Sequence, residues 1–535
     1  MLPINDLPAT VLAQILLTAV GTPAASLAEW KTNLPLVAVC RTWTALAQCH
    51  VFRRVFVELA TPPRSHVNTR PYWTSNAELL ISRRCVLAAR HLTMALSDRV
   101  SPGCLQSIAL DILKLDCVDW QHINTLVLPK ATWALNRSAK PVSRHKRAVA
   151  DIALTVQYFA RNLRNIVVLD MSYLNQGSTG KYLYSNLVAF YGQKLQVLRA
   201  EGPIPFSAFC IARNIRVLEL TLDSLAACVL PSICGETLRV LKMENVPRNF
   251  AWHYFRYDIF VRPVVFRQLT VLRLAFKLED KILTEDEELD KVSLGASNCD
   301  QLVFPALKQL AIENCPPDCD LLYASHPFPE LQRVALSGSA RSIRHCCRLK
   351  LTWVRDLDIS MFSFDSSNTA EIHRVTSHFF AGICIGRTAA LSILMDRFAL
   401  NPDALRWINL TKLGVRTVDF YTACKAIGRL PNLANLSVNC LELDTALSAG
   451  FAIDMSLFES ADPMLAWGGR LATLSIYDFS VGSPLAVCVR CIQALVLHAE
   501  ALGRLNVPKS TMQPLSLFID MYKGRHPHLS NITVS

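Results

Sequence analysis

A six-residue phrase with apolar residues at its first, fourth and sixth positions recurs along the chain. Its last three positions alternate as in a short strand with one buried face. Copies follow one another at intervals of roughly 20 to 40 residues, which predicts parallel strands stacked side by side. One copy is Leu195-Gln-Val-Leu-Arg-Ala200, and the others begin at Ile215, Leu238, Leu269, Leu307, Leu331, Val354, Leu410, Leu433, Leu471, Leu502 and Leu529.

Between the phrases lie segments long enough for a helix or a loop, such as residues 441–460. We therefore predict an α/β fold over residues 61–535, with parallel strands on a concave face and helices or loops on a convex face. The first thirty or so residues of this range are transitional. A wound parallel sheet is the alternative, and more than ten copies of one phrase argue against it.

The first sixty residues carry a different pattern, which is helical. Asp6 can cap a helix that has Pro8 in its first turn and a repeating apolar face behind it. Gly21 ends this helix, and a second apolar block begins at Leu34. Two or three short helices of roughly fifty residues cannot bury both apolar faces on themselves, so they need a partner or a packed neighbour.

Two blocks of this segment resemble the F-box motif, in the version common among fungal F-box proteins with leucine-rich tails. The first is Leu7-Pro8 with Leu12, Ile15 and Leu16; the second is Val39-Cys40-Arg41-x-Trp43-x-x-Leu46-Ala47, followed by Phe52-Arg53-x-Val55. The link from Gly21 to Asn33 is longer than usual, and Phe52 stands where the family more often has Trp. The alternative is a helical pair that only caps the array behind it.

The resemblance implies a three-helix F-box over residues 1–60, docked on the Skp1 adaptor of a cullin-RING ubiquitin ligase. By the same resemblance, the residues that contact Skp1 are Leu7, Pro8, Leu12, Ile15 and Leu16, with Val39, Cys40, Trp43 and Leu46 sharing or supporting the interface.

The recurring phrase itself resembles the leucine-rich repeat. Leu307-x-x-Leu310-x-Ile312-x-x-Cys315 is similar to the cysteine-containing subtype found in many F-box proteins. Elsewhere the Asn or Cys of the ninth position is mostly missing and the spacing varies. We therefore expect a degenerate leucine-rich-repeat solenoid with irregular curvature.

Charged side chains at the fifth position of the phrase point to a recognition surface. The third and fifth positions face solvent, because the first, fourth and sixth positions point into the core. Fifth positions are charged in the earlier repeats and mostly small in the later ones. The substrate-binding residues that we predict are Arg199, Glu219, Lys242 and Arg273, a small net-positive patch suited to an acidic or phosphorylated segment.

Composition narrows the class of protein. Hydrophobic residues make up 51% and charged residues 18%, which is a composition that folds. The net charge of +12 is spread thinly, and the basic cluster from Arg137 to Arg147 lacks aromatic residues, which argues against nucleic acid as a partner. The sequence has no secretion signal and no run of ~18 apolar residues, so we expect a cytoplasmic or nuclear protein without membrane contact.

No enzyme motif was found, neither a phosphate-binding loop, a nucleophile elbow nor a zinc-binding His-Glu-x-x-His helix. Cys488 and Cys491 have metal-like spacing, but no second pair stands at finger distance, so we expect no metal and no cofactor. The function predicted is a non-catalytic substrate-recognition adaptor of an SCF-type ubiquitin ligase, with a Skp1-like adaptor, a cullin and an unknown protein substrate as partners. Alternatives are an F-box scaffold that directs no ubiquitination, a solenoid unconnected to ubiquitin, and an enzyme with an unrecognised site.

Overall fold

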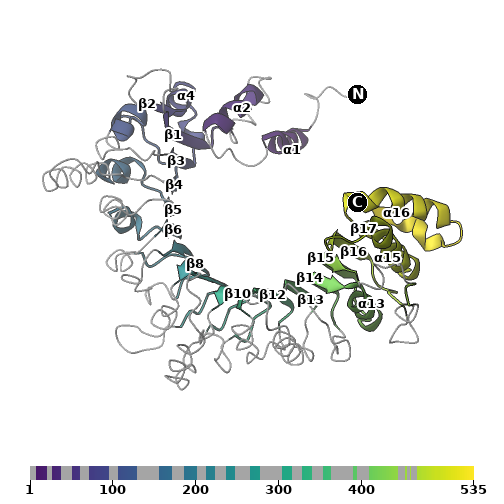
Figure 1. Cartoon of the computed structure of the whole chain (residues 1–535). Coiled ribbons are helices and arrows are strands. Elements are labelled where there is room, and N and C mark those ends of the chain that lie inside the picture. Colours follow the sequence, from purple (N-terminus) through teal and green to yellow (C-terminus); the bar gives the residue numbers. More distant parts are fainter. Residues whose placement is uncertain are drawn as a thin grey trace, which may run out of the picture. The chain divides into compact units, whose positions relative to one another are not determined.

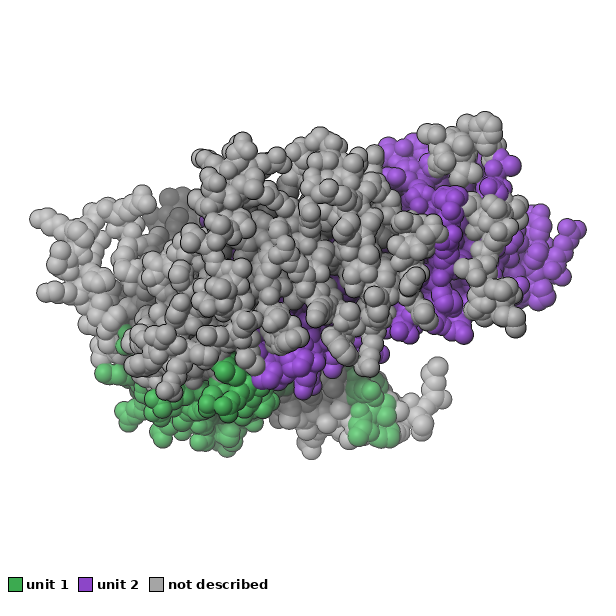
Figure 2. Space-filling model, turned by 90° about the horizontal axis from the view of Figure 1, so that it is seen from below, with its two compact units in different colours: residues 1–269 green, residues 270–535 purple. Residues whose placement is uncertain are grey.

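Figure 1 shows the computed structural model of the chain. It describes residues 8–20, 27–37, 51–60, 72–95, 107–128, 156–171, 186–201, 212–222, 236–246, 265–277, 304–315, 328–339, 354–362, 389–394, 409–443, 452–454, 458 and 467–535. The chain divides into two compact units, residues 1–269 (unit 1) and 270–535 (unit 2), which Figure 2 colours separately. Each unit is built on a largely parallel sheet, so the predicted α/β class is confirmed.

Unit 1 begins with helices and continues as a sheet. β2 is antiparallel to β1, β1 is parallel to β3, and each later strand pairs in parallel with the one before it as far as β8. The elements are α1 (Ala9–Val20), α2 (Leu27–Val37), β1 (Arg54–Ala60), β2 (Tyr72–Ser75), α4 (Ala77–Ser82), η2 (Val86–Ala88), β3 (His91–Ala95), η3 (Ile108–Ile112), β4 (Thr125–Val127), β5 (Val168–Met171), β6 (Val197–Glu201), β7 (Val217–Thr221) and β8 (Val240–Val246).

Unit 2 repeats this order of parallel strands and adds long helices near its end. From β9 to β18 every strand pairs in parallel with the next strand of the chain. The elements are β9 (Val271–Phe276), β10 (Gln309–Cys315), β11 (Arg333–Ser339), β12 (Asp356–Phe362), β13 (Ala390–Leu394), β14 (Lys412–Asp419), α13 (Phe420–Arg429), β15 (Asn435–Glu442), β16 (Thr473–Phe479), α15 (Leu485–His498), β17 (Arg504–Asn506), α16 (Lys509–Tyr522), η11 (Pro527–Asn531) and β18 (Thr533–Val534).

The fourth position of the phrase forms the central row of each core. Neighbouring strands place these residues directly opposite one another, and none is more than 2% exposed. Burying a leucine side chain contributes about 2 kcal/mol, so the row is a main source of stability. The row is Leu92, Leu126, Leu169, Leu198, Leu218 and Leu241 in unit 1, and Leu272, Leu310, Val334, Leu357, Leu391, Leu413, Leu436, Leu474 and Leu505 in unit 2.

This register confirms the phrase as the repeating strand and extends it. The rows contain four members that the sequence analysis did not recognise, at Leu92, Leu126, Leu169 and Leu391. The last predicted copy is displaced by two residues: Val534 pairs with Leu505 and so takes the fourth position, not the sixth. Leu529, its predicted start, is buried in η11, because apolar residues three apart also suit a helical turn.

Apolar residues often replace the Asn or Cys of the ninth position. In β14 and β15 the backbone pairing continues that far, and Val418 and Leu441 are buried there. In β8 and β10 the ninth position is also buried, but the backbone in front of it has a different conformation. Asn245 and Asn314 adopt left-handed backbone angles, with φ of 55° and 53°, and the residue after each is buried. The ninth position is therefore buried in all four repeats, whether an apolar residue occupies it or, as in β10, the cysteine typical of the subtype.

The first sixty residues depart from the prediction in two places. α2 begins at Leu27, so part of the predicted link is helical, and Trp30 fixes it by donating from Nε1 to the Val51 carbonyl over 2.6 Å. β1 lies within the range assigned to the F-box and pairs with β3, so the sheet begins before residue 61. Residues 38–50, which include most of the second F-box-like block, lie outside the described residues. The three-helix arrangement therefore stays a prediction.

Candidate functional site: the charged strands of unit 1

The residues predicted to bind Skp1 fall in different environments. Pro8 is exposed at the start of α1, Ile15 is half-buried, and Leu12 is 1% exposed. Leu12 therefore already packs within the chain, and its predicted contact with Skp1 stays a prediction. The other predicted contacts lie outside the residues, or the side chains, that the structure describes: Leu7, Leu16, Val39, Cys40, Trp43 and Leu46.

The predicted fifth-position charges form a row across consecutive strands. Arg199 on β6, Glu219 on β7 and Lys242 on β8 lie opposite one another in the register, with Asp170 of β5 next to Arg199. Arg199 contacts Asp170 over 3.2 Å and Glu219 over 2.8 Å. Lys242 Nζ lies 2.8 Å from the other oxygen of Glu219. We call these four residues the charge ladder.

The charge ladder is electrically balanced. Its two cations and two carboxylates alternate along the row, so the net-positive patch expected from Arg199, Glu219 and Lys242 is neutralised by Asp170. Asp170 was missed because the phrase containing β5 was not recognised. Had it been recognised, its fifth position would have shown the carboxylate. Whether the ladder residues contact a substrate stays a prediction.

The pKa values of the ladder follow from this pairing. Burial alone would raise the pKa of the Glu219 carboxyl, but the hydrogen bond from Lys242 and the nearby Arg199 outweigh it and lower the pKa. Burial likewise favours neutral Arg199, while Glu219 and Asp170 raise its pKa. Both shifts favour the charged forms of Glu219 and Arg199 at neutral pH.

Arg273, the fourth predicted substrate-binding residue, lies on β9 in unit 2. Its guanidinium is 2.6 Å from the Glu313 carboxylate of β10, and both side chains are nearly half exposed. Like the ladder cations, Arg273 is already paired with a carboxylate. The segment from Trp252 to Tyr257, which follows β8 in the sequence, lies outside the described residues.

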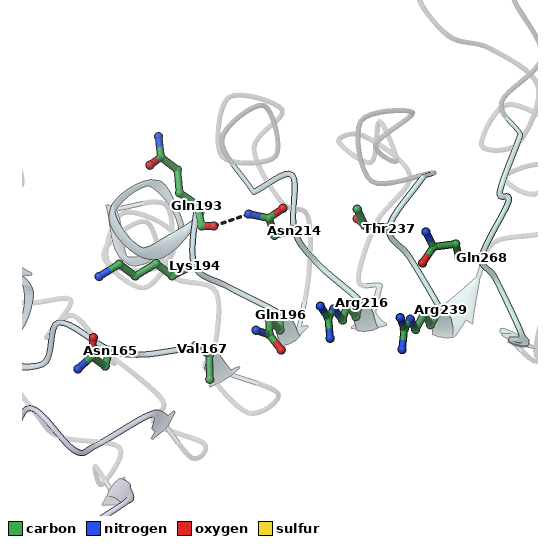
Figure 3. Close-up of a pocket in the computed structure, with 10 residues that line it drawn as sticks. All are labelled: Asn165, Val167, Gln193, Lys194, Gln196, Asn214, Arg216, Thr237, Arg239 and Gln268. Atoms are coloured by element: carbon green, nitrogen blue, oxygen red, sulfur yellow. Dashed lines mark hydrogen bonds between the residues drawn. The ribbon is translucent and has the colours of Figure 1, made fainter.

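A second polar feature of unit 1 lies where the strands begin (Figure 3). There, at the end of the sheet where the strands start, a cavity of about 600 Å³ opens. Among the described residues that line it, three side chains are cationic, none is a carboxylate, and the others are mainly amides. We call it the edge pocket; it is lined by Asn165, Val167, Gln193, Lys194, Gln196, Asn214, Arg216, Thr237, Arg239 and Gln268.

Backbone pairing positions the edge pocket. The Arg216 N–H donates to the Gln196 carbonyl over 2.7 Å, and the Arg239 N–H donates to the Arg216 carbonyl over 2.8 Å. The second positions of three phrases therefore follow one another, and in Figure 3 the Gln196, Arg216 and Arg239 side chains lie in a row at the starts of their strands. The prediction of binding residues considered only the third and fifth positions of the phrase. Both arginines are at the second position, where the sequence also shows them.

Side-chain bonds hold the turns behind this row. Asn214 donates from Nδ2 to the Gln193 carbonyl over 2.7 Å, as Figure 3 shows. Thr237 donates from Oγ1 toward the carbonyls of Arg213 and Ile215. Lys194 Nζ donates to the neutral backbone carbonyl of Arg164 over 2.9 Å. The lining is thus built on fixed turns.

The cysteines considered as metal ligands are buried side chains of α15. Cys488 and Cys491 face the core, and the part of the chain that the structure describes contains no group of three or more His, Cys, Asp or Glu residues arranged to hold a metal. Within the same described residues, no helix has the length and apolar character needed to cross a membrane.

Comparison with known proteins adds no family to these observations. No family model matches the chain, and no curated protein matches it.

Proposed function

We propose that the chain is a substrate-recognition adaptor of an SCF-type ubiquitin ligase. In this proposal an F-box in the first sixty residues docks on a Skp1-like adaptor and through it on a cullin. The strand array, as a degenerate leucine-rich-repeat solenoid, binds a target protein. The observation that supports it most is the six-residue phrase, repeated in register along the parallel strands of both units and preceded in the sequence by an F-box-like pair of blocks.

A stack of parallel strands suits this task because it presents one row of side chains from each repeat along a continuous face. A target held on such a face remains close to a ubiquitin-carrying subunit elsewhere in the complex. Its effective concentration there is high, so the chain supplies proximity and no catalytic group.

The helix α2 connects the proposed docking segment with the array. The backbone N–H of Leu27, at the start of α2, donates to the Glu58 carboxylate of β1 over 2.6 Å. Trp30 is buried beside Phe52, with their ring centroids 6.3 Å apart. α2 is therefore fixed to the sheet, which would keep a bound Skp1 at a defined position relative to unit 1.

Co-purification with a Skp1 protein tests the proposal, with variants chosen by exposure. Val11 is 39% exposed and Ile15 half-buried, and their spacing of four residues places them on one face of α1. We expect Val11→Asp with Ile15→Asp to abolish Skp1 capture, because charges there oppose burial in an interface. The matched control is Thr10→Asp with Gln14→Asp, at exposed positions with the same spacing, and it should retain capture.

Circular dichroism melting of both double variants separates lost docking from lost folding. Skp1 capture by the folded Val11→Asp, Ile15→Asp protein would exclude this face of α1 as the docking site. If the chain captures Skp1 but the proteins that co-purify with it are not ubiquitinated, the scaffold alternative is favoured.

A further inference from the structure

We propose that η11 and β18 of unit 2 form a clasp that opens as the pH falls below neutral, with His498, His526 and His528 as its sensor. We call residues 523–535, which contain both elements, the end clasp. The inference goes beyond the proposed function and does not depend on it. The observations that support it are the few bonds that hold the end clasp and the arrangement of the three histidines beneath it.

The end clasp is held to unit 2 by a short stretch of backbone pairing and one apolar anchor. β18 has two residues and pairs with β17; the Thr533 N–H, for example, donates to the Gly503 carbonyl over 2.9 Å. Leu529 of η11 is completely buried. Segments with few buried contacts and few backbone bonds open locally while the rest of a protein stays folded. The end clasp is therefore suited to respond to a small change in charge.

Three histidines lie together where the end clasp packs against the C-terminal turn of α15. His528 Nε2 is 3.2 Å from the backbone carbonyl of Val496. His526 lies beside it, with the two ring centroids 5.9 Å apart. His498 belongs to the last turn of α15, and the charge of His526 acts on it. Protonated rings would therefore place like charges on both sides of the contact between the end clasp and α15.

Aromatic packing fixes His498 on the α15 side of this contact. Its ring stacks on that of Phe458, with centroids 4.2 Å apart, and lies edge-on to Trp467 at 6.3 Å. Trp467 in turn donates from Nε1 to the Cys424 carbonyl over 3.3 Å. Both aromatic side chains are buried. Because turning His498 toward water would break this packing, repulsion there is relieved by movement of the end clasp.

The surroundings of His498 decide the direction of the effect. A helix C-terminus and aromatic faces favour a positive charge and would raise its pKa. Burial and the neighbouring His526 outweigh them, so the pKa of His498 is lowered from its ordinary value of 6.5. The closed clasp thus favours neutral His498, and protonation favours the open form. The contribution to stability is fully present above pH 6.5 and is lost as the pH falls from there toward the lower value of the closed clasp.

Other charged and titratable groups on the surrounding elements do not account for a response near pH 6. Among the described side chains, His526 is the one whose charge acts on the pKa of His498. The others belong to residue types that do not ordinarily titrate between about pH 5.5 and 7.5. They are Cys424, Lys425 and Arg429 of α13, Arg470 before β16, Glu500 after α15, and Asp520, Tyr522, Lys523 and Arg525 in or after α16.

Opening of the end clasp would uncover the backbone edge of β17 and the apolar surface beneath Leu529. The Val507 N–H, which donates to the Ser535 carbonyl over 3.0 Å, would be released. A strand edge with unpaired N–H and C=O groups can accept a further strand. Acidification would therefore create a binding edge at β17 that is covered at neutral pH.

Hydrogen exchange followed by mass spectrometry tests the clasp in the full-length chain at about pH 7.5 and about pH 5.5. Labelling times are scaled for the intrinsic pH dependence of exchange. A histidine that is neutral in the closed form and ordinary in the open form changes the opening equilibrium by up to about tenfold over this range. We expect protection of peptides from residues 523–535 to fall by about threefold to tenfold, and peptides from β14 and β15 to keep theirs.

Two substitutions remove the sensor. His498→Phe keeps a ring that can stack on Phe458 and cannot become charged, and His526→Gln removes the neighbouring charge. The double variant should keep its protection at the lower pH. His122→Gln, at an exposed histidine of unit 1, is the control and should respond like the unchanged protein. Protection of α15 at the higher pH checks the packing around residue 498; where His498→Phe disturbs it, His526→Gln alone should still reduce the response.

Three results would overturn the inference: equal protection of residues 523–535 at the two pH values, a full response in the folded variants that lack the sensor, or a loss of protection spread evenly over unit 2. The third result would mean that acid weakens the whole unit and not the end clasp. Skp1 is absent from this assay, so failure of the proposed function shows itself separately.

Discussion

Glu219 is the residue on which the charge ladder depends, since each of its two oxygens contacts a different cation. Arg199 keeps a second partner in Asp170, whereas among the described residues Lys242 pairs with Glu219 alone. Removing the Glu219 charge therefore affects β6, β7 and β8 together. Partly exposed ion pairs contribute little one by one, and more when several charges form a network.

We expect Glu219→Gln to lower the free energy of unfolding at pH 7 by about 1 kcal/mol. The pKa of Glu219 is lowered in the folded protein, so its contribution is present above its ordinary value of 4.5 and is lost as the pH falls through the lower folded value. Urea unfolding of both proteins at pH 7 and near pH 3 measures this. A stability difference that is equal at the two pH values would contradict the pairing.

Asn314 shows how far single residues could be predicted. Sequence reasoning identified Cys315 as the ninth position and did not consider the residue before it. Asn314 takes a positive φ, donates from Nδ2 to the Phe276 carbonyl over 3.0 Å, and its N–H donates to Ser337 Oγ. Asn tolerates the left-handed region better than most residues. Such a turn depends on neighbouring strands, so the local sequence alone does not show it.

At the scale of elements, the strands were predictable because an apolar residue occupies the fourth position of the phrase, which is buried in every described copy except the last, where Val534 is half-buried. Leu218 on β7 illustrates this: it is fully buried, between Leu198 and Leu241 in the register. Helices were less predictable. α2 was read in part as a link, because its buried residues Leu27 and Trp30 are too few to make a helical period obvious, and its stability comes from packing on β1.

Leu218→Ala should lower the free energy of unfolding by about 3 kcal/mol, because it removes buried methyl groups and leaves a cavity in the central row. Val217→Ala is the control: Val217 precedes it on the half-exposed face of β7, and its truncation should cost less than half as much. Chemical denaturation followed by circular dichroism measures both. Similar losses for the two variants would mean that the face of β7 has been assigned the wrong way round.

At the scale of the whole molecule, the repeated sheet was predictable and the division into two units was not. The spacing of apolar residues shows which residues share a face of the sheet. That spacing continues unchanged past the boundary between residues 269 and 270, so it does not indicate the boundary. The edge pocket was missed for a related reason. Its residues belong to turns and strand starts of several repeats, and only the register of neighbouring strands brings Lys194, Arg216 and Arg239 to one edge.

The rate at which each cysteine thiol reacts depends on how deeply the surrounding structure buries it. Cys117 is exposed, whereas Cys424 of α13 and Cys491 of α15 are completely buried. Burial raises the pKa of Cys424 and raises that of Cys491 to about 12. Since the thiolate is the reactive form, we expect a thiol reagent at neutral pH to label Cys117 first and the two buried cysteines much more slowly.

Peptide mapping by mass spectrometry after timed labelling measures the order. The same labelling in denaturant is the control, since there the three cysteines should react at similar rates. Native labelling of Cys424 as fast as Cys117 would show that α13 does not pack as the structure has it.

Within each unit, nearly every strand hydrogen-bonds to the strand that follows it in the chain, and this order has a consequence for how the protein folds. The loops that must close are only those between successive phrases, so the entropy of loop closure is small at every step. A nucleus of two or three repeats can form at any place in a unit and grow by adding neighbours. Folding should therefore proceed by propagation from several starting points, and a damaged repeat should slow the growth past itself while the repeats on either side still form.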